Sequence, residues 1–219
     1  MLLRLASTGL ILIAAYLLGS IPTGYLAGYL LKGIDIRQYG SGSIGATNVL
    51  RTLGKGPALV VLLVDALKGV LAIALVQIFY AGLGTSIIPL TWKTWLVALA
   101  GLAAVLGHSK SVWINFTGGK SAATGLGILL AMSWPVGLGT LGVFVVILAA
   151  SQIVSLASIA SACVVCLLMI LLSQPLPYLL FAFAAGVYVI LRHRNNIQRM
   201  LEGKEPRLGQ QMPSETKIS

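Results

Sequence analysis

Seven long apolar stretches, separated by short polar segments, account for most of this sequence. They cover residues 5–31, 57–80, 94–107, 122–133, 136–150, 153–172 and 176–191. A backbone in hydrocarbon must pair every N–H and C=O internally, so such stretches cross a membrane as α-helices. Charged residues make up only 9% of the chain, whereas a soluble domain carries about 25%. The sequence therefore predicts an all-α integral membrane protein with seven transmembrane helices.

The basic residues predict how these helices are oriented. Most of the 15 Lys and Arg residues lie in three polar segments. The first segment contains Lys32, Arg37, Arg51 and Lys55, the second contains Lys110 and Lys120, and the third contains Arg192, Arg194, Arg199, Lys204, Arg207 and Lys217. Segments rich in Lys and Arg stay on the cytoplasmic side of a membrane. We therefore expect all three segments on the cytoplasmic face.

The number of crossings follows from this sidedness. Two segments on the same side are joined by an even number of crossings, so residues 121–191 cross either twice or four times. Two crossings would need about 35 residues each, far more than the ~20 that span a bilayer. Breaks at Trp134-Pro135, Ser151-Gln152 and Pro175-Leu176-Pro177 divide the stretch into four. Seven helices then place the N-terminus outside and the C-terminus in the cytoplasm, and Pro22 predicts a kink in the first.

The chain is interpreted as a single membrane domain, residues 1–207, followed by a short polar tail, residues 208–219. Its net charge of +10 lies beside the apolar stretches, where it faces negative lipid headgroups rather than nucleic acid. Cys163 and Cys166 lie inside an apolar stretch, and no second Cys/His pair completes a metal site. We expect membrane lipid as the surroundings, no metal or other cofactor, and no obligate protein partner.

The polar clusters all fall on the predicted cytoplasmic face. They are GSGSIGATNVLR (residues 40–51), GHSKSVWINFTGGKSAAT (107–124), QIVSLAS (152–158) and RHRNNIQRMLEGKE (192–205). Glycine N–H groups, hydroxyl and amide side chains, and cations are the groups that bind phosphate in proteins. Arginine adds a planar fork that holds a phosphate with two hydrogen bonds. The four segments therefore predict one phosphate-binding site at the membrane surface.

Two matches to nucleotide-binding motifs fail on their context. Residues 40–45 have the Gly-x-Gly-x-x-Gly spacing of a dinucleotide fingerprint, but that motif needs a soluble βαβ unit, and Asp65 lies in an apolar helix. Residues 118–121 resemble the end of a P-loop, but Ile114 stands where the first glycine is required. We therefore do not expect a nucleotide site.

Four polar side chains each allow two interpretations. Asp65 and Lys68 are three residues apart in an apolar helix, so they form either a structural ion pair or a support for the site. His108 is either a cap-type hydrogen bonder in a loop or a site residue. His193 belongs either to a basic anchor for anionic lipid or to the site, where it would share a helix face with Asn196.

Six motifs occur in order along nearly the whole chain. They are G-S-G-x-x-G-A-T-N-x-x-R from residue 40, D-x-x-K-G from residue 65, G-H at residue 107, F-x-G-G-K from residue 116, V-S-L-A-S from residue 154 and H-R-x-N-I-x-R from residue 193. This pattern resembles the PlsY family, the bacterial acyl-phosphate:glycerol-3-phosphate acyltransferases. The resemblance implies a multi-pass, seven-helix enzyme of the bacterial plasma (inner) membrane with its site facing the cytoplasm. It also implies transfer of a fatty acyl group from acyl phosphate to the 1-hydroxyl of sn-glycerol 3-phosphate. The products would be lysophosphatidate and inorganic phosphate, in the first acylation of phospholipid synthesis.

The resemblance further implies roles for individual residues. The phosphate cradle for the acyl donor would consist of Ser41, Gly42, Ser43, Ala46, Thr47 and Asn48. The contacts to glycerol 3-phosphate and the transition state would come from Arg51, Lys120, Ser155, His193 and Asn196. Supporting positions would be Arg37, Asp65, Lys68, His108, Gly118 and Gly119. Two positions depart from the family pattern, because Ser43 stands where asparagine is common and Ser121 where glycine is common.

An acyl phosphate is already activated, so the site needs mainly to align the hydroxyl and neutralise the departing phosphate. The sequence lacks the histidine followed five residues later by aspartate that soluble-type acyltransferases use. We therefore expect direct transfer without a covalent intermediate, with His193 or a substrate phosphate oxygen taking the proton. The alternative is a small permease for an organic anion, suggested by a faint similarity between residues 43–47 and 120–124.

Overall fold

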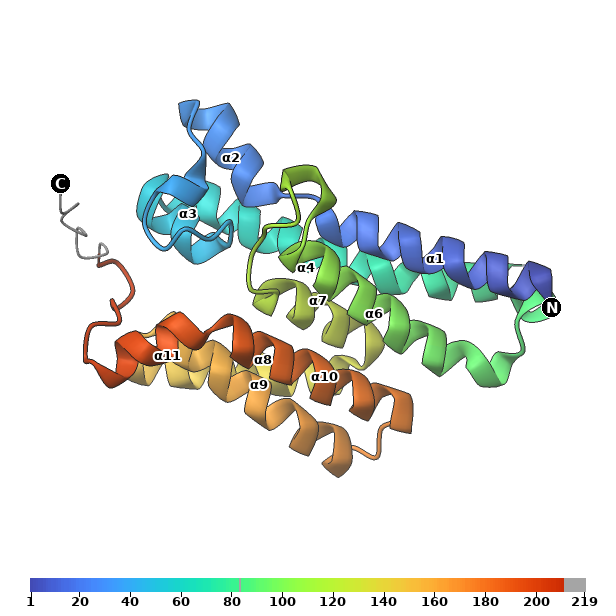
Figure 1. The fold of residues 1–219 in the computed structure, drawn as a ribbon. Helices are drawn as coiled ribbons and strands as arrows, with labels where there is room; N and C mark the ends of the chain where they lie inside the picture. Colours follow the sequence, from blue (N-terminus) through green and yellow to red (C-terminus); the bar gives the residue numbers. More distant parts are fainter. Residues whose placement is uncertain (83, 211–219) are drawn as a thin grey trace.

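The computed structural model describes residues 1–82 and 84–210, which are built from helices (Figure 1). The apolar helices are α1 (Leu2–Ser20), α2 (Thr23–Lys32), α4 (Lys55–Ala81), α6 (Lys93–Ser109), α7 (Ala122–Met132), α8 (Trp134–Ser151), α9 (Val154–Leu171) and α10 (Leu176–Arg192). The shorter elements are η1 (Ile36–Gln38), α3 (Ala46–Thr52), α5 (Gly84–Ile87), η2 (Leu90–Trp92), η3 (Val112–Ile114) and α11 (Arg194–Leu201). Each of the seven predicted stretches contains at least one helix, which confirms the all-α prediction. The predicted tail falls mostly on residues 211–219, outside the described part.

The kink predicted at Pro22 is a complete break between α1 and α2. Proline has no N–H and interrupts the helical hydrogen-bond ladder. The carbonyl of Ile21 accepts a hydrogen bond from Lys68 Nζ at 2.9 Å. Thr23 Oγ1, on the other side of the break, donates to Asp65 Oδ1 at 2.7 Å. The two buried charges of α4 therefore bind both sides of the break.

Five helical segments of the described chain are long and apolar enough to cross a membrane, with α1 and α2 counted as one. A sixth results if α10 and α11 form one span bent by 56°. The remaining apolar helix, α7, has only 11 residues. Its length of about 16 Å is roughly half of the ~30 Å hydrocarbon core. The multi-pass character is thus confirmed, whereas seven complete crossings stay a prediction.

Two groups of helices face each other in the bundle. The first group contains α1, α4, α6 and α7, the second contains α8, α9 and α10, and the pairs α7–α8 and α6–α10 join the groups. Figure 1 shows α7 on the side of the first group that faces the second. Gly69 faces the backbone of Thr124, and Gly127 faces the backbone of Ala66, with no room for a Cβ atom at either glycine. The absence of side chains here lets α7 lie directly against α4.

The polar segments gather at one end of the bundle. α3 and α11 lie at this end and the N-terminus at the opposite end (Figure 1). The loop after α6 is fixed to α1, because Ser111 Oγ donates to Ser20 O at 2.5 Å and Tyr16 OH donates to Lys110 O at 2.6 Å. Arg37 connects the first loop to the same region by donating to Thr117 Oγ1 at 2.9 Å. Segments far apart in sequence therefore meet at one end, as the sequence predicts.

The side of the membrane that this end faces can be tested by cysteine labelling of intact cells. Because basic loops stay in the cytoplasm, we expect Lys110→Cys to react with a membrane-impermeant maleimide only after permeabilisation. Ser86→Cys, in α5, should react without it, and both positions are exposed in the structure. Alanine at Cys163 and Cys166 in both variants removes the native thiols. The reverse labelling pattern would overturn the orientation.

Candidate active site

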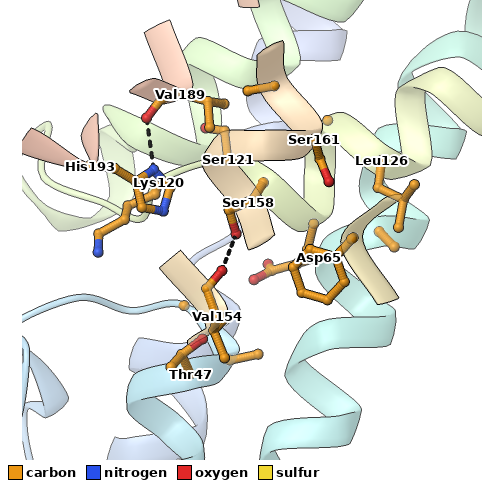
Figure 2. A pocket seen from close by; sticks show the side chains of 18 of the residues that line it. Thr47, Asp65, Lys120, Ser121, Leu126, Val154, Ser158, Ser161, Val189 and His193 are labelled. Atoms are coloured by element: carbon orange, nitrogen blue, oxygen red, sulfur yellow. Dashed lines mark hydrogen bonds between the residues drawn. The ribbon is translucent and has the colours of Figure 1, made fainter. Parts of the chain in front are cut away.

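A cavity of about 430 Å³ begins among the polar segments and continues between the two helix groups (Figure 2). A smaller cavity of about 140 Å³ adjoins it, and Ser41, Ser43, Lys120 and Asn196 line both. The larger one lies within the size range of small-molecule sites, ~300–1,000 Å³. Its lining residues come from all four polar segments and from the apolar helices beneath them. The site is therefore polar at one end and apolar along most of its length.

The structure brings together the residues predicted to bind both substrates. The following predicted residues line one or both cavities: Ser41, Gly42, Ser43, Ala46, Thr47, Asn48, Arg51, Lys120, Ser155, His193 and Asn196. Of the supporting positions, Asp65, His108 and Gly118 also line them. Figure 2 shows Lys120 and His193 close together, with Thr47 and Asp65 on other walls of the cavity. The remaining supporting residues, Arg37, Lys68 and Gly119, line neither of the two cavities.

Asn48 organises the first polar loop. Its Oδ1 accepts a hydrogen bond from the backbone N–H of Ser41 at 2.9 Å. Its Nδ2 donates at 2.8 to 3.1 Å to the carbonyls of Ile36, Tyr39 and Ser43. The residue is only 1% exposed. Because its amide is committed to backbone groups, Asn48 shapes the loop rather than offering hydrogen bonds to a ligand.

The conformation of this loop depends on glycine and on a serine hydroxyl. Gly40 and Gly42 have φ angles of 56° and 67°, in the left-handed region that residues with a Cβ rarely adopt. Ser43 Oγ accepts a hydrogen bond from Gly45 N at 3.2 Å. Ser43, at a position where the PlsY family commonly has asparagine, thus makes a local turn bond. The loop presents its backbone closely to the cavity.

The glycine pair before Lys120 is held from both sides. Gly119 N donates to His108 O at 3.1 Å. Arg192 Nη2 donates to the carbonyls of Gly118 and Gly119 at 3.2 and 3.1 Å. A Cβ atom on Gly119 would collide with the imidazole of His108. The last apolar helix and α6 together fix the backbone that carries Lys120.

The surroundings of Ser121 explain how serine can stand at a position where the family commonly has glycine. It precedes α7 with φ 63° and ψ 11°, a left-handed conformation that glycine adopts without strain. Its hydroxyl lies 2.6 Å from Ser109 Oγ and donates to Val105 O at 2.9 Å. These hydrogen bonds hold a non-glycine residue in a conformation that normally costs about 1–3 kcal/mol.

A buried carboxylate connects three of the predicted site residues. Lys120 Nζ donates to Asn196 Oδ1 at 2.5 Å, and Asn196 Nδ2 donates to Glu205 Oε1 at 2.6 Å. Ser155 Oγ donates to the same oxygen at 2.7 Å. Arg199 Nε donates to Glu205 Oε2 at 2.7 Å. Glu205 therefore fixes the positions of Ser155 and Asn196 relative to Lys120.

The two charges at the ends of this network have shifted pKa values. Burial lowers the pKa of Lys120 to about 8; the carboxylate of Glu205 opposes this shift, and the cations Arg199 and Arg51 add to it. Burial alone would raise the pKa of Glu205, but hydrogen bonds from Asn196, Ser155 and Arg199 hold it below its usual value. Glu205 thus stays ionised and is a poor proton acceptor. Lys120 is poised to change charge near neutral pH.

His193 stands between α10 and α11 with one ring nitrogen engaged. Its Nδ1 lies 2.8 Å from the carbonyl oxygen of Val189 (Figure 2). A carbonyl only accepts hydrogen bonds, so Nδ1 carries the proton in the neutral ring and Nε2 is the acceptor. His193 and Asn196 both line the larger cavity. Their placement agrees with the predicted common face, and it leaves Nε2 of His193 as a hydrogen-bond acceptor.

Asp65, Lys68 and His108 form a buried cluster beneath the loops. Lys68 Nζ lies 2.8 Å from Asp65 Oδ1, and both side chains are 2% exposed, so the ion pair is confirmed. His108 Nδ1 lies 3.6 Å from the same carboxylate oxygen. His108 belongs to the last turn of α6 and not to a loop, and it packs against Gly119. The cluster therefore supports the backbone around Lys120.

Arg37 lies outside both cavities. It forms an ion pair with Asp35 at 2.6 Å and donates to Ile114 O at 3.3 Å as well as to Thr117. Arg37 thus joins the first polar loop to the loop after α6. Its place is structural, which agrees with the supporting position implied by the family resemblance.

Glu205 is the site residue that the sequence does not reveal. It stands between Lys204 and Pro206, after the last apolar stretch, where a charged side chain is normally solvated. In the structure its side chain is only 3% exposed. One signal in the sequence is that acidic residues are rare, because the chain has only 5 Asp and Glu residues. The other was its place at the end of the basic segment 192–205.

A cationic pocket that continues into an apolar cavity is typical of helical membrane proteins that bind an amphiphilic anion. A family model described as glycerol-3-phosphate acyltransferase matches residues 9–203, and the chain belongs to that family.

Curated relatives support the same assignment. The glycerol-3-phosphate acyltransferase of Trichormus variabilis is 60% identical over 99% of both chains. That of Rippkaea orientalis is 55% identical over 96% of this chain and 97% of its own.

Two solved structures are also similar. Crystal structures of PlsY (YgiH), an integral membrane glycerol 3-phosphate acyltransferase, match with TM-scores of 0.81 in the glycerol 3-phosphate form and 0.79 in the lysophosphatidic acid form. They are 38% and 37% identical and cover 93% and 92% of this chain, and 96% and 95% of their own.

Proposed function

We propose that the protein transfers a fatty acyl group from acyl phosphate to the 1-hydroxyl of sn-glycerol 3-phosphate, producing 1-acyl-glycerol 3-phosphate and inorganic phosphate. The observation that carries this proposal is the continuity between a cationic pocket and an apolar cavity in one helix bundle. One substrate has a chain that belongs in hydrocarbon, the other is a small dianion, and both carry phosphate. The names of the similar proteins support the acceptor, and the lysophosphatidic acid form of PlsY supports the product.

The bond changes are those of direct acyl transfer. The 1-hydroxyl oxygen attacks the carbonyl carbon of the acyl phosphate, the new ester C–O bond forms, and the C–O bond to phosphate breaks. The hydroxyl proton passes to His193 Nε2 or to a phosphate oxygen of the substrate. Ser155 is not set up as a nucleophile, because its partner Glu205 has a lowered pKa and also accepts hydrogen bonds from Asn196 and Arg199. Direct transfer thus needs only groups that the cavity presents.

Different sets of residues bind the two substrates. The backbone and hydroxyls of residues 41–47 hold the phosphate of the acyl donor, with Asn48 shaping the loop. Arg51, Lys120, Ser155, His193 and Asn196 hold glycerol 3-phosphate and the charge that develops during transfer. Arginine suits bidentate contact with phosphate, whereas lysine acts as a point charge. The site faces the cytoplasm of a bacterial inner membrane in this proposal, where glycerol 3-phosphate reaches it from water and the donor from lipid.

Purified protein in detergent tests the proposal against the alternative of an anion permease. An enzyme releases inorganic phosphate and lysophosphatidate from palmitoyl phosphate and glycerol 3-phosphate without a sealed compartment. A permease shows no turnover in micelles, only uptake into vesicles. Palmitoyl-CoA in place of palmitoyl phosphate tests the donor, and we expect no product from it. Absence of turnover with acyl phosphate, or equal turnover with the CoA ester, would contradict the proposed function.

The pKa of Lys120 predicts a pH dependence. The ammonium is charged below a pH of about 8 and neutral above it, and only the charged form attracts a phosphate dianion. Since kcat/KM reports groups of the free enzyme, we expect kcat/KM for glycerol 3-phosphate to fall as pH rises through about 8. Donor hydrolysis without enzyme is subtracted at each pH. In Lys120→Arg this limb should vanish, because a guanidinium stays charged up to a pH of about 12; a limb retained in that variant would assign it to another group.

A further inference from the structure

The apolar part of the larger cavity reaches deep into the bundle. It is lined on α7 and α8 by Leu126, Leu141 and Phe144, and on α9 and α10 by Ser158, Val165 and Phe181. Figure 2 shows Ser158 and Ser161 on this wall, with Leu126 facing them. The hydroxyl of Ser158 donates to Val154 O at 2.9 Å and that of Ser161 to Thr140 O at 3.3 Å. The serines are thus satisfied by backbone, and the wall suits a hydrocarbon chain.

Lining residues near the polar end of the cavity are exposed on the outside of the bundle, and those at its deep end are buried. Leu62 and Leu63, which line the first part on α4, are 43% and 59% exposed. The deepest lining residues are nearly inaccessible, with Val165 at 4%, Phe181 at 2% and Ala182 at 1% exposure. A chain that enters from the bilayer therefore meets a floor inside the protein.

The depth of this floor follows from helix geometry. Val165 lies ten residues along α9 from Ser155, and Phe181 lies twelve residues along α10 from His193. With a rise of 1.5 Å per residue, the floor lies about 15–18 Å from the polar groups. One leaflet is half of the ~30 Å hydrocarbon core, about 15 Å. The cavity thus has the depth of an acyl chain of ordinary membrane length.

The width of the cavity depends on small residues of α9 and α10. Ala162, Ala185 and Gly186 supply part of the wall at intermediate depth. A Cβ atom at Gly186 would lie 2.9 Å from the carbonyl oxygen of Ala162, so the two helices are already in close contact there. The contact leaves no space between the two helices for a larger side chain. Larger side chains at Ala162 or Ala185 must therefore project into the cavity.

We propose that this cavity selects the length of the donor's acyl chain. Phe181 and Val165 form its floor, and the alanines of α9 and α10 set its width. The inference rests on the proposed function, since the chain measured is that of the acyl phosphate. The class of donor it assigns is a long, membrane-length acyl phosphate whose terminal methyl reaches Phe181. A longer chain leaves methylenes without room, and a shorter one leaves apolar space unfilled.

A chain-length series of acyl phosphates from octanoyl to eicosanoyl tests this selection. For Ala162→Leu, about 10 Å below Ser155, we expect the ratio of kcat/KM for palmitoyl over decanoyl phosphate to fall at least tenfold. One misplaced methylene in an apolar pocket is worth about 10–200-fold. Ala185→Leu should shift the ratio in the same direction. Cys163→Leu is the matched control, because the neighbouring residue is exposed on the outside of the same helix, and its ratio should equal that of the wild type.

Phe181→Leu tests the floor in the opposite sense. Its smaller side chain should raise the relative kcat/KM for eicosanoyl phosphate. Wild-type ratios in Ala162→Leu and Ala185→Leu would overturn the length selection, and so would equal losses for all donors in those two variants but not in Cys163→Leu. Failure of the proposed function is a different result, namely no turnover of any acyl phosphate by the wild type.

Discussion

Lys120→Ala should lower kcat for acyl transfer by about 10²–10³-fold, the usual loss when one preorganised transition-state donor is removed. The side chain is half-buried beside Asn196, donates to its Oδ1 at 2.5 Å and lines both cavities. At this point it can neutralise a phosphate that gains charge as the C–O bond breaks. A turnover assay with saturating palmitoyl phosphate and glycerol 3-phosphate measures the loss.

Lys110→Ala is the matched control for this variant. Lys110 lies in the same polar loop but is exposed, and it lines neither cavity. We expect near wild-type kcat for it and monodisperse protein for both variants in size-exclusion chromatography. Comparable kcat values in the two variants would show that Lys120 does not stabilise the transition state, and Arg51 would then be the phosphate contact.

Glu205→Ala should lower kcat/KM for glycerol 3-phosphate by about 10²-fold, because misplacement of reacting groups by about 1 Å costs that much. Ser155 and Asn196 both donate to Glu205 Oε1, and Arg199 forms a 2.7 Å ion pair with the other oxygen. The variant leaves all three without their common partner. Loss of one partner from a buried ion pair is strongly destabilising, so the thermal midpoint should fall as well.

Two variants separate positioning from folding. Glu205→Gln keeps an oxygen for Ser155 and Asn196 but loses the charge opposite Arg199, so its kcat/KM should lie between those of wild type and Glu205→Ala. Glu202→Ala changes a carboxylate three residues away whose side chain is 40% exposed, and its kinetics should be normal. Wild-type kinetics in Glu205→Ala at a temperature where it is folded would show that Ser155 and Asn196 do not need this carboxylate.

Much of the architecture is visible in the sequence, because hydrocarbon imposes helices and basic residues mark the loops. The break at Pro22 and the ion pair of Asp65 with Lys68 follow from one proline and one spacing. The meeting of four polar segments was predicted from an even number of crossings between the basic loops, and the structure brings the segments together. The apolar stretch 122–133 also predicts a short helix, α7 (Ala122–Met132), but not its place facing the second helix group.

The details of the site are less predictable, since they depend on tertiary partners. Asn48 has the composition of a ligand-binding residue, yet its amide is consumed by four backbone groups. Glu205 has the setting of a solvated tail residue, yet Ser155 and Arg199 surround it. Ser121 takes a glycine-like conformation because Ser109 and Val105 bind its hydroxyl. No local pattern encodes these contacts.

The ion pair within α4 also bears on how this helix enters the bilayer. A lone charge near the middle of a helix raises the free energy of insertion by about 2.5–3.5 kcal/mol. Asp65 and Lys68 can pair within their own helix, so α4 can partition into lipid as a nearly neutral segment before its neighbours arrive. In the folded protein, Lys68 donates a further hydrogen bond to Ile21 and Asp65 accepts one from Thr23. The two charges that raise the free energy of insertion therefore also favour the packing of α4 against the segment that is broken at Pro22.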